Sequence, residues 1–251
     1  ALSLLSHIWK NVDQEKTQSK FIILLEKCNP QPEDIQLLFT VMTKMAENYP
    51  APFDGKEIKK MKKLIKPFFD PENNLIISNF IKNLLNIQKG KLFETEQLSS
   101  ILKWISKDVE KIDISIFNLI TLIFSKINNI PSDNSPIPTI QFNGIDILWN
   151  LLFNSKLPQV SIYFVGLVAR CQDSNAISTF INQCLSKLDN IGSLNALQML
   201  VLKIENPLDL SAMGITRSIF IPQNRYINVN FDGDYNNSLK VLNGISVNLI
   251  K

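Results

Sequence analysis

Three cysteines and a single histidine are the residues of this chain best suited to nucleophilic or metal chemistry. The cysteines are Cys28, Cys171 and Cys184, and the histidine is His7. A catalytic thiolate needs a base beside it, and nothing in the sequence brings His7 next to a cysteine. No Cys or His pair has zinc-ligand spacing, and no glycine-rich phosphate loop occurs. We therefore expect no catalytic residue, no metal site and no cofactor, and we interpret Cys171 and Cys184 as buried packing residues.

The strongest charge feature is the basic run KEIKKMKKLIK at residues 56–66. On a helix its apolar residues share the inner face and its lysines lie outside. The inner residues are Ile58, Met61, Leu64 and Ile65. The candidate partner-binding basic face consists of Lys59, Lys60, Lys62 and Lys63. Such a face could bind an acidic partner, a phosphate backbone or an anionic membrane, but a solvated helix face is the favoured interpretation. No arginine or aromatic residue lies between these lysines, so nucleic-acid binding is not expected.

The composition indicates a helical globular protein that can bury a sizeable core. The chain has 251 residues, of which 45% are hydrophobic and 20% charged, with a net charge of only +3. Eight glycines are few for this length, which favours helices over an all-β fold. No apolar run reaches the roughly 18 residues that indicate a transmembrane helix. Three scattered cysteines suit a reducing compartment, so we predict a cytoplasmic protein.

Helical periodicity extends from the start of the chain to about residue 205. The expected helices cover residues 2–12, 21–28, 32–45, 58–68, 75–87, 95–105, 112–127, a pair within 142–171, 176–188 and 194–204. Taken two at a time they give a repeat of roughly 40 residues, the length of HEAT and armadillo units. We predict an all-α fold, a HEAT/armadillo-like α-α superhelix with a short β-rich C-terminal tail. A flat helical bundle is the competing arrangement.

Two changes of composition suggest the domain organisation. Residues 128–139, NNIPSDNSPIPT, contain three prolines and small polar residues and are a candidate loop or linker. From residue 211 onward the sequence becomes β-rich, with expected strands at residues 218–221, 226–231 and 245–250. We therefore predict a helical-repeat region over residues 1–210 with a break near 128–139. Residues 211–251 are the expected β-rich tail, a candidate start of a ubiquitin-like domain.

The helix GIDILWNLL at residues 144–152 and its partner up to Cys171-Gln172-Asp173 resemble the helical-repeat scaffold of the fat-facets (FAF) type of ubiquitin-specific protease. Residues 2–49, including Ile8-Trp9 and the run at 32–39, are similar to another piece of that scaffold. Residues 181–185 and the β-rich tail are similar to its passage into a ubiquitin-like domain. Residues 50–95 match little. The family's catalytic Cys and His boxes match nothing here, so the resemblance implies a scaffold segment without catalytic residues.

These observations lead to two hypotheses about function. The first is a non-catalytic protein-interaction scaffold segment of a large ubiquitin-specific protease-like protein, whose partners include ubiquitin-pathway substrates. The alternative is an armadillo-type adaptor or docking module unrelated to ubiquitin. An enzyme with an unrecognised site is a third reading. Protein partners are expected in either leading case, and neither nucleic acid nor a transmembrane segment is expected.

Overall fold

The computed structural model describes residues 20–23, 26–27, 31–47, 49, 52–87, 92–133, 135–138 and 141–205 of the chain. These residues are mainly helical, and the only β pairing among them is an isolated parallel bridge between Ile137 and Cys171. The predicted all-α class is therefore confirmed for this part of the chain. His7, Cys28 and the expected β-rich tail at residues 211–251 lie outside the described residues.

The chain divides into two compact units, Ala1–Ile127 and Asn128–Lys251, which we call the first and second units. The α-helices of the first unit are α3 (Ile35–Ala46), α4 (Gly55–Ile65), α5 (Asn74–Asn86), α6 (Thr95–Ile105) and α7 (Ile114–Ile127). Short 3-10 helices occur at Pro32–Asp34, Lys66–Phe68 and Val109–Lys111. The second unit contains α8 (Ile145–Asn154), α9 (Pro158–Arg170), α10 (Ser174–Leu185) and α11 (Ile191–Glu205).

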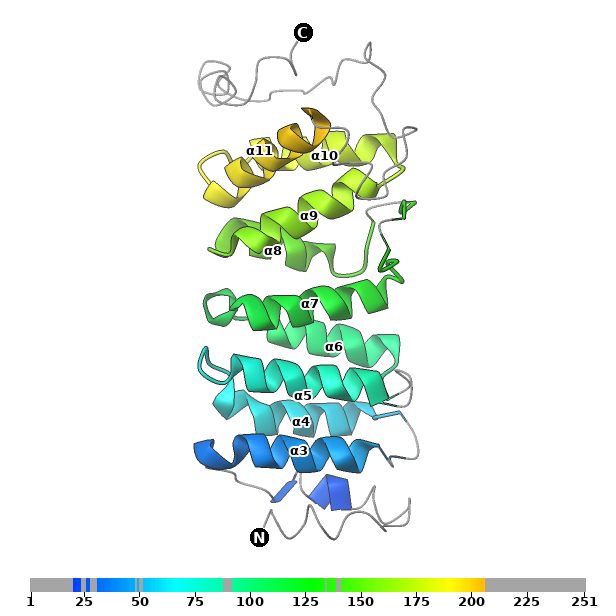
Figure 1. Ribbon diagram of the computed structural model, residues 1–251, viewed down its shortest axis with the longest axis vertical. Helices are drawn as coiled ribbons and strands as arrows, with labels where there is room; N and C mark the ends of the chain where they lie inside the picture. The colour runs from blue at the N-terminus through cyan, green and yellow to red at the C-terminus, as the bar shows by residue number, and fades with distance from the viewer. Residues whose placement is uncertain are drawn as a thin grey trace. The chain divides into compact units, whose positions relative to one another are not determined.

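Helices of the first unit pack in two layers (Figure 1). In one layer α3 packs against α5 and α5 against α7, and in the other α4 packs against α6. Each helix is amphipathic, so its apolar stripe is covered by its neighbours. The stripe of α3, for example, buries Leu38, Met42 and Met45 completely. The core of this unit therefore lies between the two layers.

Two buried polar side chains join α5 to the chain that follows it. Asn74 Nδ2 donates to the Lys111 carbonyl over 2.8 Å, and Ser78 Oγ donates to the Ser115 carbonyl over 2.9 Å. Both side chains are fully buried. A buried polar group needs such a partner, since an unsatisfied one costs about 1–3 kcal/mol. These two bonds thus favour one alignment of α5 along α7.

The core of the second unit is built around aromatic rings. Trp149 on α8 packs edge-on against Phe164 of α9, with ring centroids 4.5 Å apart. Phe180 of α10 contacts both rings, at 5.3 Å from Trp149 and 5.1 Å from Phe164. Phe164 and Phe180 are fully buried. Three helices of this unit are therefore joined through one ring cluster.

The backbone at the start of α11 packs directly against the backbone near the end of α8. A Cβ atom added to Gly192 would lie 1.8 Å from the Leu152 carbonyl oxygen, so only glycine fits there. Asn190 caps the helix, because its Oδ1 accepts from the Gly192 N–H at 2.9 Å and from the Ser193 N–H at 3.3 Å. Its Nδ2 donates to the Phe153 carbonyl. Apolar spacing predicted that this helix begins at residue 194, but because Asn190 caps it, the helix begins at Ile191.

The described residues between 128 and 138 form no helix, as their prolines predict. Arg170, the last residue of α9, holds this segment. Its Nε donates to the Ser135 carbonyl over 3.0 Å, and its Nη2 donates to the carbonyls of Pro131 and Asp133 over 3.1 and 2.9 Å. The Ile137 N–H donates to the Arg170 carbonyl over 2.9 Å, and the Ile137 carbonyl accepts from the Gln172 N–H over 2.8 Å. The segment is therefore bound to its own unit.

Candidate functional site

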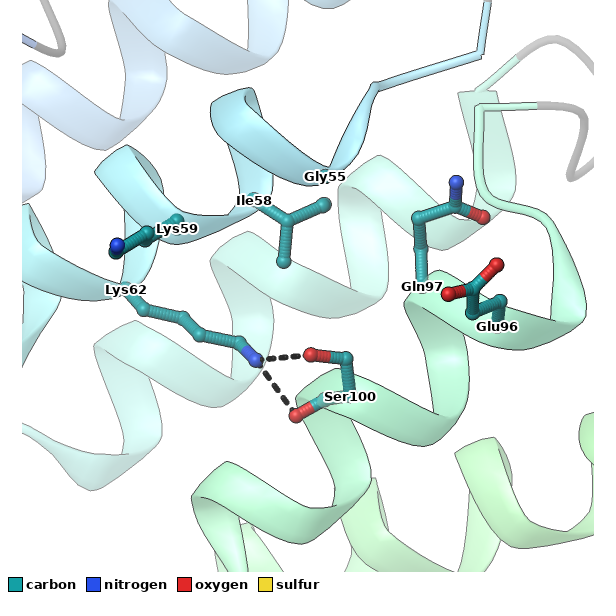
Figure 2. Close-up of a pocket in the computed structure, with 7 residues that line it drawn as sticks. All are labelled: Gly55, Ile58, Lys59, Lys62, Glu96, Gln97 and Ser100. Carbon is teal, nitrogen blue, oxygen red and sulfur yellow. Dashed lines mark hydrogen bonds between the residues drawn. The ribbon is translucent and has the colours of Figure 1, made fainter.

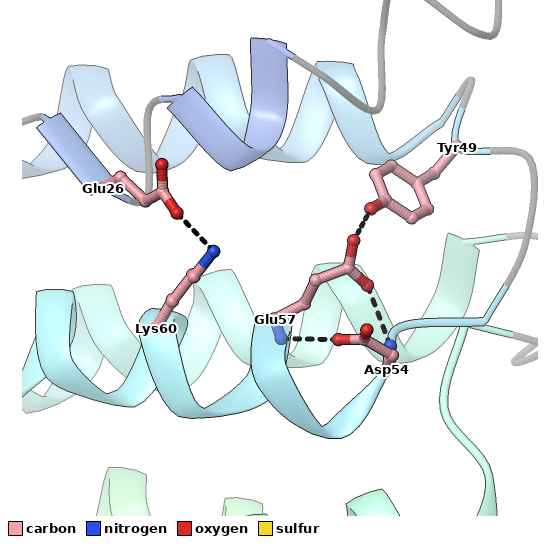
Figure 3. Close-up of polar contacts among 5 residues, drawn as sticks. All are labelled: Glu26, Tyr49, Asp54, Glu57 and Lys60. Atoms are coloured by element: carbon pink, nitrogen blue, oxygen red, sulfur yellow. Dashed lines mark hydrogen bonds and ion pairs between the residues drawn. The ribbon is translucent and has the colours of Figure 1, made fainter.

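The candidate site is the lysine-rich helix α4, whose first turn is held by a capping box (Figure 3). The Glu57 N–H donates to Asp54 Oδ1 over 2.7 Å, and the Asp54 N–H donates to Glu57 Oε2 over 2.8 Å. The Tyr49 hydroxyl donates to the other Glu57 oxygen. Two backbone donors that the helix itself cannot satisfy are thus partnered. The box fixes where α4 begins and therefore which of its side chains face outward.

The inner face of α4 is the one that the sequence predicted. Ile58, Met61, Leu64 and Ile65 are all buried. The lysines occupy the rest of the helix circumference, which we call the outer face, but they differ in their surroundings. Lys59 and Lys63 are exposed, whereas Lys60 and Lys62 are half-buried at its two edges. The four lysines of the candidate basic face are therefore not equivalent.

Lys60 stands at the edge of α4 that faces the preceding segment (Figure 3). Its ammonium forms an ion pair with the Glu26 carboxylate. The hydrogen bond from Lys60 and the charge of Lys60 lower the pKa of Glu26. Because this ion pair lies near the surface, water and salt screen it. Lys60 is thus partly neutralised by its own chain.

Lys62 stands at the opposite edge and reaches across to α6 (Figure 2). Its Nζ donates to the Ser100 carbonyl over 2.7 Å and to Ser100 Oγ over 2.6 Å. Burial lowers the pKa of Lys62, because desolvation disfavours the ammonium form. Both of its hydrogen-bond partners are neutral. An anion beside Lys62 would therefore meet a positive charge that its own chain leaves unpaired among the described residues.

A pocket of about 350 Å³ lies between α4 and α6, and we call it the α4–α6 pocket. Its lining residues are Gly55, Ile58, Lys59 and Lys62 from α4, and Glu96, Gln97 and Ser100 from α6. Figure 2 shows the two lysines toward one end and Glu96 toward the other. The volume is at the lower end of the range for ligand sites. The lining offers cations, an amide and a hydroxyl, which suit binding rather than nucleophilic chemistry.

The thiols of the second unit are buried. Cys171 is 1% exposed and Cys184 is fully buried. Burial raises the pKa of the Cys184 thiol to about 12, and it also raises the pKa of Cys171. A thiol with a raised pKa is not a nucleophile near neutral pH. Both cysteines pack as the sequence analysis predicted.

Within the described residues, no three or more His, Cys, Asp or Glu side chains lie together in a group that could hold a metal ion. In the same part of the chain, no helix has both the length and the apolar character needed to cross a membrane.

Sequence reasoning missed two residues that shape the site. Glu57 lies inside the basic run and looks exposed by charge, yet it is 5% exposed. The spacing of Asp54 and Glu57 is a capping-box signature, so the capping role of Glu57 could have been predicted, although its burial could not. Ser100 gives no such signal, since it lies 38 residues beyond Lys62. Only the packing of α4 on α6 brings the two together.

Comparisons with known proteins identify no relative. The chain matches no protein-family model, and neither a curated protein nor a solved structure matches it.

Proposed function

We propose that this chain is a protein-interaction scaffold, a segment of α-solenoid that binds partner proteins and carries no catalytic residue of its own. Following the family resemblance, the parent protein is a large, cytoplasmic ubiquitin-specific protease-like protein. The observation that carries the proposal is the even spacing of equivalent residues through the alternating helices of the first unit. A solenoid stacks identical units, so each position recurs in its neighbour one repeat later.

The layer formed by α3, α5 and α7 supports this spacing. One residue of each helix is fully buried at an equivalent position: Leu38, Ile77 and Ile116. The number of residues from the first to the second equals that from the second to the third. At the same interval, Thr40, Asn79 and Asn118 are all exposed. The interval is roughly 40 residues, the length of a HEAT or armadillo repeat.

The layer formed by α4 and α6 supports it independently. Phe53 and Phe93 precede these helices at equivalent positions, and their rings contact at a centroid distance of 5.3 Å. The Phe53 N–H donates to the Leu92 carbonyl over 2.8 Å. At each helix start, a backbone N–H donates to the side chain three residues later, Asp54 to Glu57 and Glu94 to Gln97 over 2.9 Å. Equivalent residues thus stack on one another, as neighbouring repeats do.

Excision of one repeat tests the solenoid. Deleting residues 74–112 joins Asn73 to Asp113 and puts α7 in the place of α5. A solenoid predicts that the shortened chain keeps its helical circular dichroism per residue and unfolds cooperatively, because α7 brings the same buried pattern. Deleting only residues 74–91 is the matched control. It moves α6 into the wrong layer and should reduce helix content. Loss of helix in the full-repeat deletion would favour a compact bundle.

The absence of catalysis is tested with ubiquitin that carries an electrophile at its C-terminus. We expect no covalent adduct with this chain, since the described thiols, Cys171 and Cys184, are buried with raised pKa values. Adduct formation by this segment alone would overturn the proposal.

The alternative is an armadillo-type adaptor or docking module unrelated to ubiquitin. It is supported by the same helical layers, since neither the α4–α6 pocket nor the ring cluster of the second unit favours one partner family. The flanking sequence of the complete reading frame separates the two. A domain with the Cys and His boxes of a deubiquitinase supports the first proposal, and a domain of another class supports the adaptor.

A further inference from the structure

The exposed lysines of α4 and of its C-cap residue form a line along the helix. Lys56, Lys59, Lys63 and Lys66 are all exposed and follow one another at steps of three, four and three residues. These steps place side chains on one face. At about 1.5 Å of rise per residue the line is ~15 Å long. We call these four residues the lysine stripe.

The lysine stripe has no internal counter-charge among the described residues. The ion pairs found there join Lys60 to Glu26 and Lys111 to Asp108. Like charges one turn apart on a helix repel each other. The lysines of the stripe therefore repel one another, and an anionic partner would relieve this repulsion.

The α4–α6 pocket lies beside the stripe and shares Lys59 with it. At the same end of the pocket, the Lys62 ammonium donates to two neutral acceptors of Ser100, its carbonyl and its hydroxyl. An ammonium has three donors, so Lys62 keeps one for a ligand. A ligand whose carboxylates pair with the lysine stripe can thus also reach the half-buried ammonium of Lys62.

We propose that the lysine stripe and the α4–α6 pocket together bind an acidic, carboxylate-rich segment of a partner protein. This rests on the proposed scaffold function and names the chemistry of its partner. The acidic side chains pair with Lys59, Lys62 and Lys63. The Gln97 amide, which lines the pocket on α6, is placed to meet the partner's peptide groups.

Glu96 sets the direction of the bound segment. It lines the end of the pocket away from Lys62 (Figure 2) and is exposed. Its carboxylate repels an acidic side chain placed there. The segment therefore carries its acidic residues over the lysines and a neutral or basic residue beside Glu96.

A membrane is disfavoured as the occupant of this surface. Helices that bind at a lipid interface insert apolar side chains into it. The large hydrophobic side chains exposed in the described residues are Ile23, Leu75, Ile114, Ile162 and Ile191, and none of these lies on α4 or α6. The apolar residues of α4 are buried in the core of the first unit.

A nucleic acid is disfavoured as well. A single strand binds through base stacking on aromatic side chains as well as through charge. No aromatic residue lies between the lysines of the stripe or lines the α4–α6 pocket, and the adjoining Glu96 repels a phosphate backbone. The net charge of +3 is also low for a chain of 251 residues that binds nucleic acid.

The test is fluorescence anisotropy with the full chain and a labelled peptide of about ten residues in which Glu alternates with Ser, long enough to cover the stripe. We expect saturable binding that weakens as salt rises. The double variant Lys59→Glu/Lys63→Glu should weaken it at least about tenfold. The matched control Lys44→Glu/Lys126→Glu changes the net charge equally, on exposed lysines of α3 and α7, and should leave affinity within about twofold.

Glu96→Gln adds a test in the opposite direction, because removing the repelling carboxylate should tighten binding of the same peptide. Circular dichroism of every variant establishes that the fold is retained. Phosphatidylserine vesicles and a single-stranded oligothymidine serve as competing ligands. No binding of the acidic peptide, equal losses in both double variants, or binding to the vesicles or oligonucleotide alone would overturn the proposal. Such results leave the scaffold proposal standing, because that proposal fails only on the repeat deletion or on a ubiquitin adduct.

Discussion

The two units share one kind of contact between helices, but only the second also brings the backbones of two helices, α8 and α11, into direct contact at a described glycine. In each unit a buried serine donates to a backbone carbonyl of the next helix in the layer. Ser78 reaches Ser115 over 2.9 Å in the first unit, and Ser161 reaches Gly192 over 3.4 Å in the second. Of the described glycines Gly55, Gly166 and Gly192, only Gly192 has a backbone atom where a Cβ would lie, the Leu152 carbonyl oxygen. The described contacts that align the helices are thus made by side chains in the first unit, and in the second unit also by direct backbone contact.

This difference concerns function as well as packing. The first unit combines its buried contacts with an exposed helix α4 whose lysines take no part in the core. Such a surface can change without disturbing the fold. The residues of the ring cluster and of the Gly192 contact tolerate substitution less well, because tightly packed interiors resist changes of volume. The comparison predicts large losses of stability in the second unit and small ones on the surface of the first.

The largest effect is expected at the centre of the ring cluster. Phe164→Ala removes a fully buried ring that contacts Trp149 and Phe180. It should lower the free energy of unfolding by about 3–5 kcal/mol, as measured by urea denaturation. Phe153→Ala is the control, since this ring is half-buried at the edge of the cluster. A smaller loss for Phe164→Ala than for Phe153→Ala would contradict the cluster as the core of the unit.

The next effect tests the close approach of α11 to α8. Gly192→Ala places a methyl group against the Leu152 carbonyl and should destabilise the protein by about 1–3 kcal/mol. Gly166→Ala in α9 is the matched control, because a Cβ there meets no atom within 4 Å. Alanine favours the helix over glycine by about 0.8–1 kcal/mol, so this control should be stabilising. Equal melting temperatures for the two variants would refute the backbone contact.

A moderate effect is expected between α5 and α7 of the first unit. Ser78→Ala removes the hydroxyl that bonds to the Ser115 carbonyl and should cost about 1 kcal/mol. Ser99→Ala is the comparison, since its hydroxyl bonds only to the Thr95 carbonyl within its own helix. Thermal unfolding of both proteins measures the difference. If Ser99→Ala destabilises the chain as much as Ser78→Ala, the inter-helix bond contributes nothing.

The smallest effect is expected on the lysine stripe. Reversing the charges of Lys59 and Lys63 should change the free energy of unfolding by no more than about 0.5 kcal/mol, as for other surface positions. Adding Lys60→Glu removes the ion pair with Glu26, and helical circular dichroism should still be retained. A loss of helix in either variant would mean that these lysines are structural.

The helices themselves could be predicted well from the sequence. The expected helix over residues 95–105 has the bounds of α6, and Pro32-Glu33-Asp34 indeed begins the helical segment that continues as α3. Errors occurred where a distant or capping contact decides the boundary. The helix α11 begins at Ile191 because the Asn190 side chain caps it, and apolar periodicity does not register a polar cap.

The candidate site could be predicted only in part. The inward face of α4 followed from the spacing of Ile58, Met61 and Ile65. The different surroundings of its lysines did not follow, because Glu26 and Ser100 lie 34 and 38 residues from their lysine partners. Helical periodicity predicts the direction in which a side chain points but not the residues that it contacts.

The sequence by itself determined the helical class and the buried face of each helix, since both depend on apolar spacing at 3.6 residues per turn within one segment. The tertiary structure decided which lysines remain exposed, which residues line the α4–α6 pocket and why residue 192 must be glycine. These features arise where helices distant in sequence come into contact. Their geometry depends on how the interior fills its volume, which no local pattern specifies.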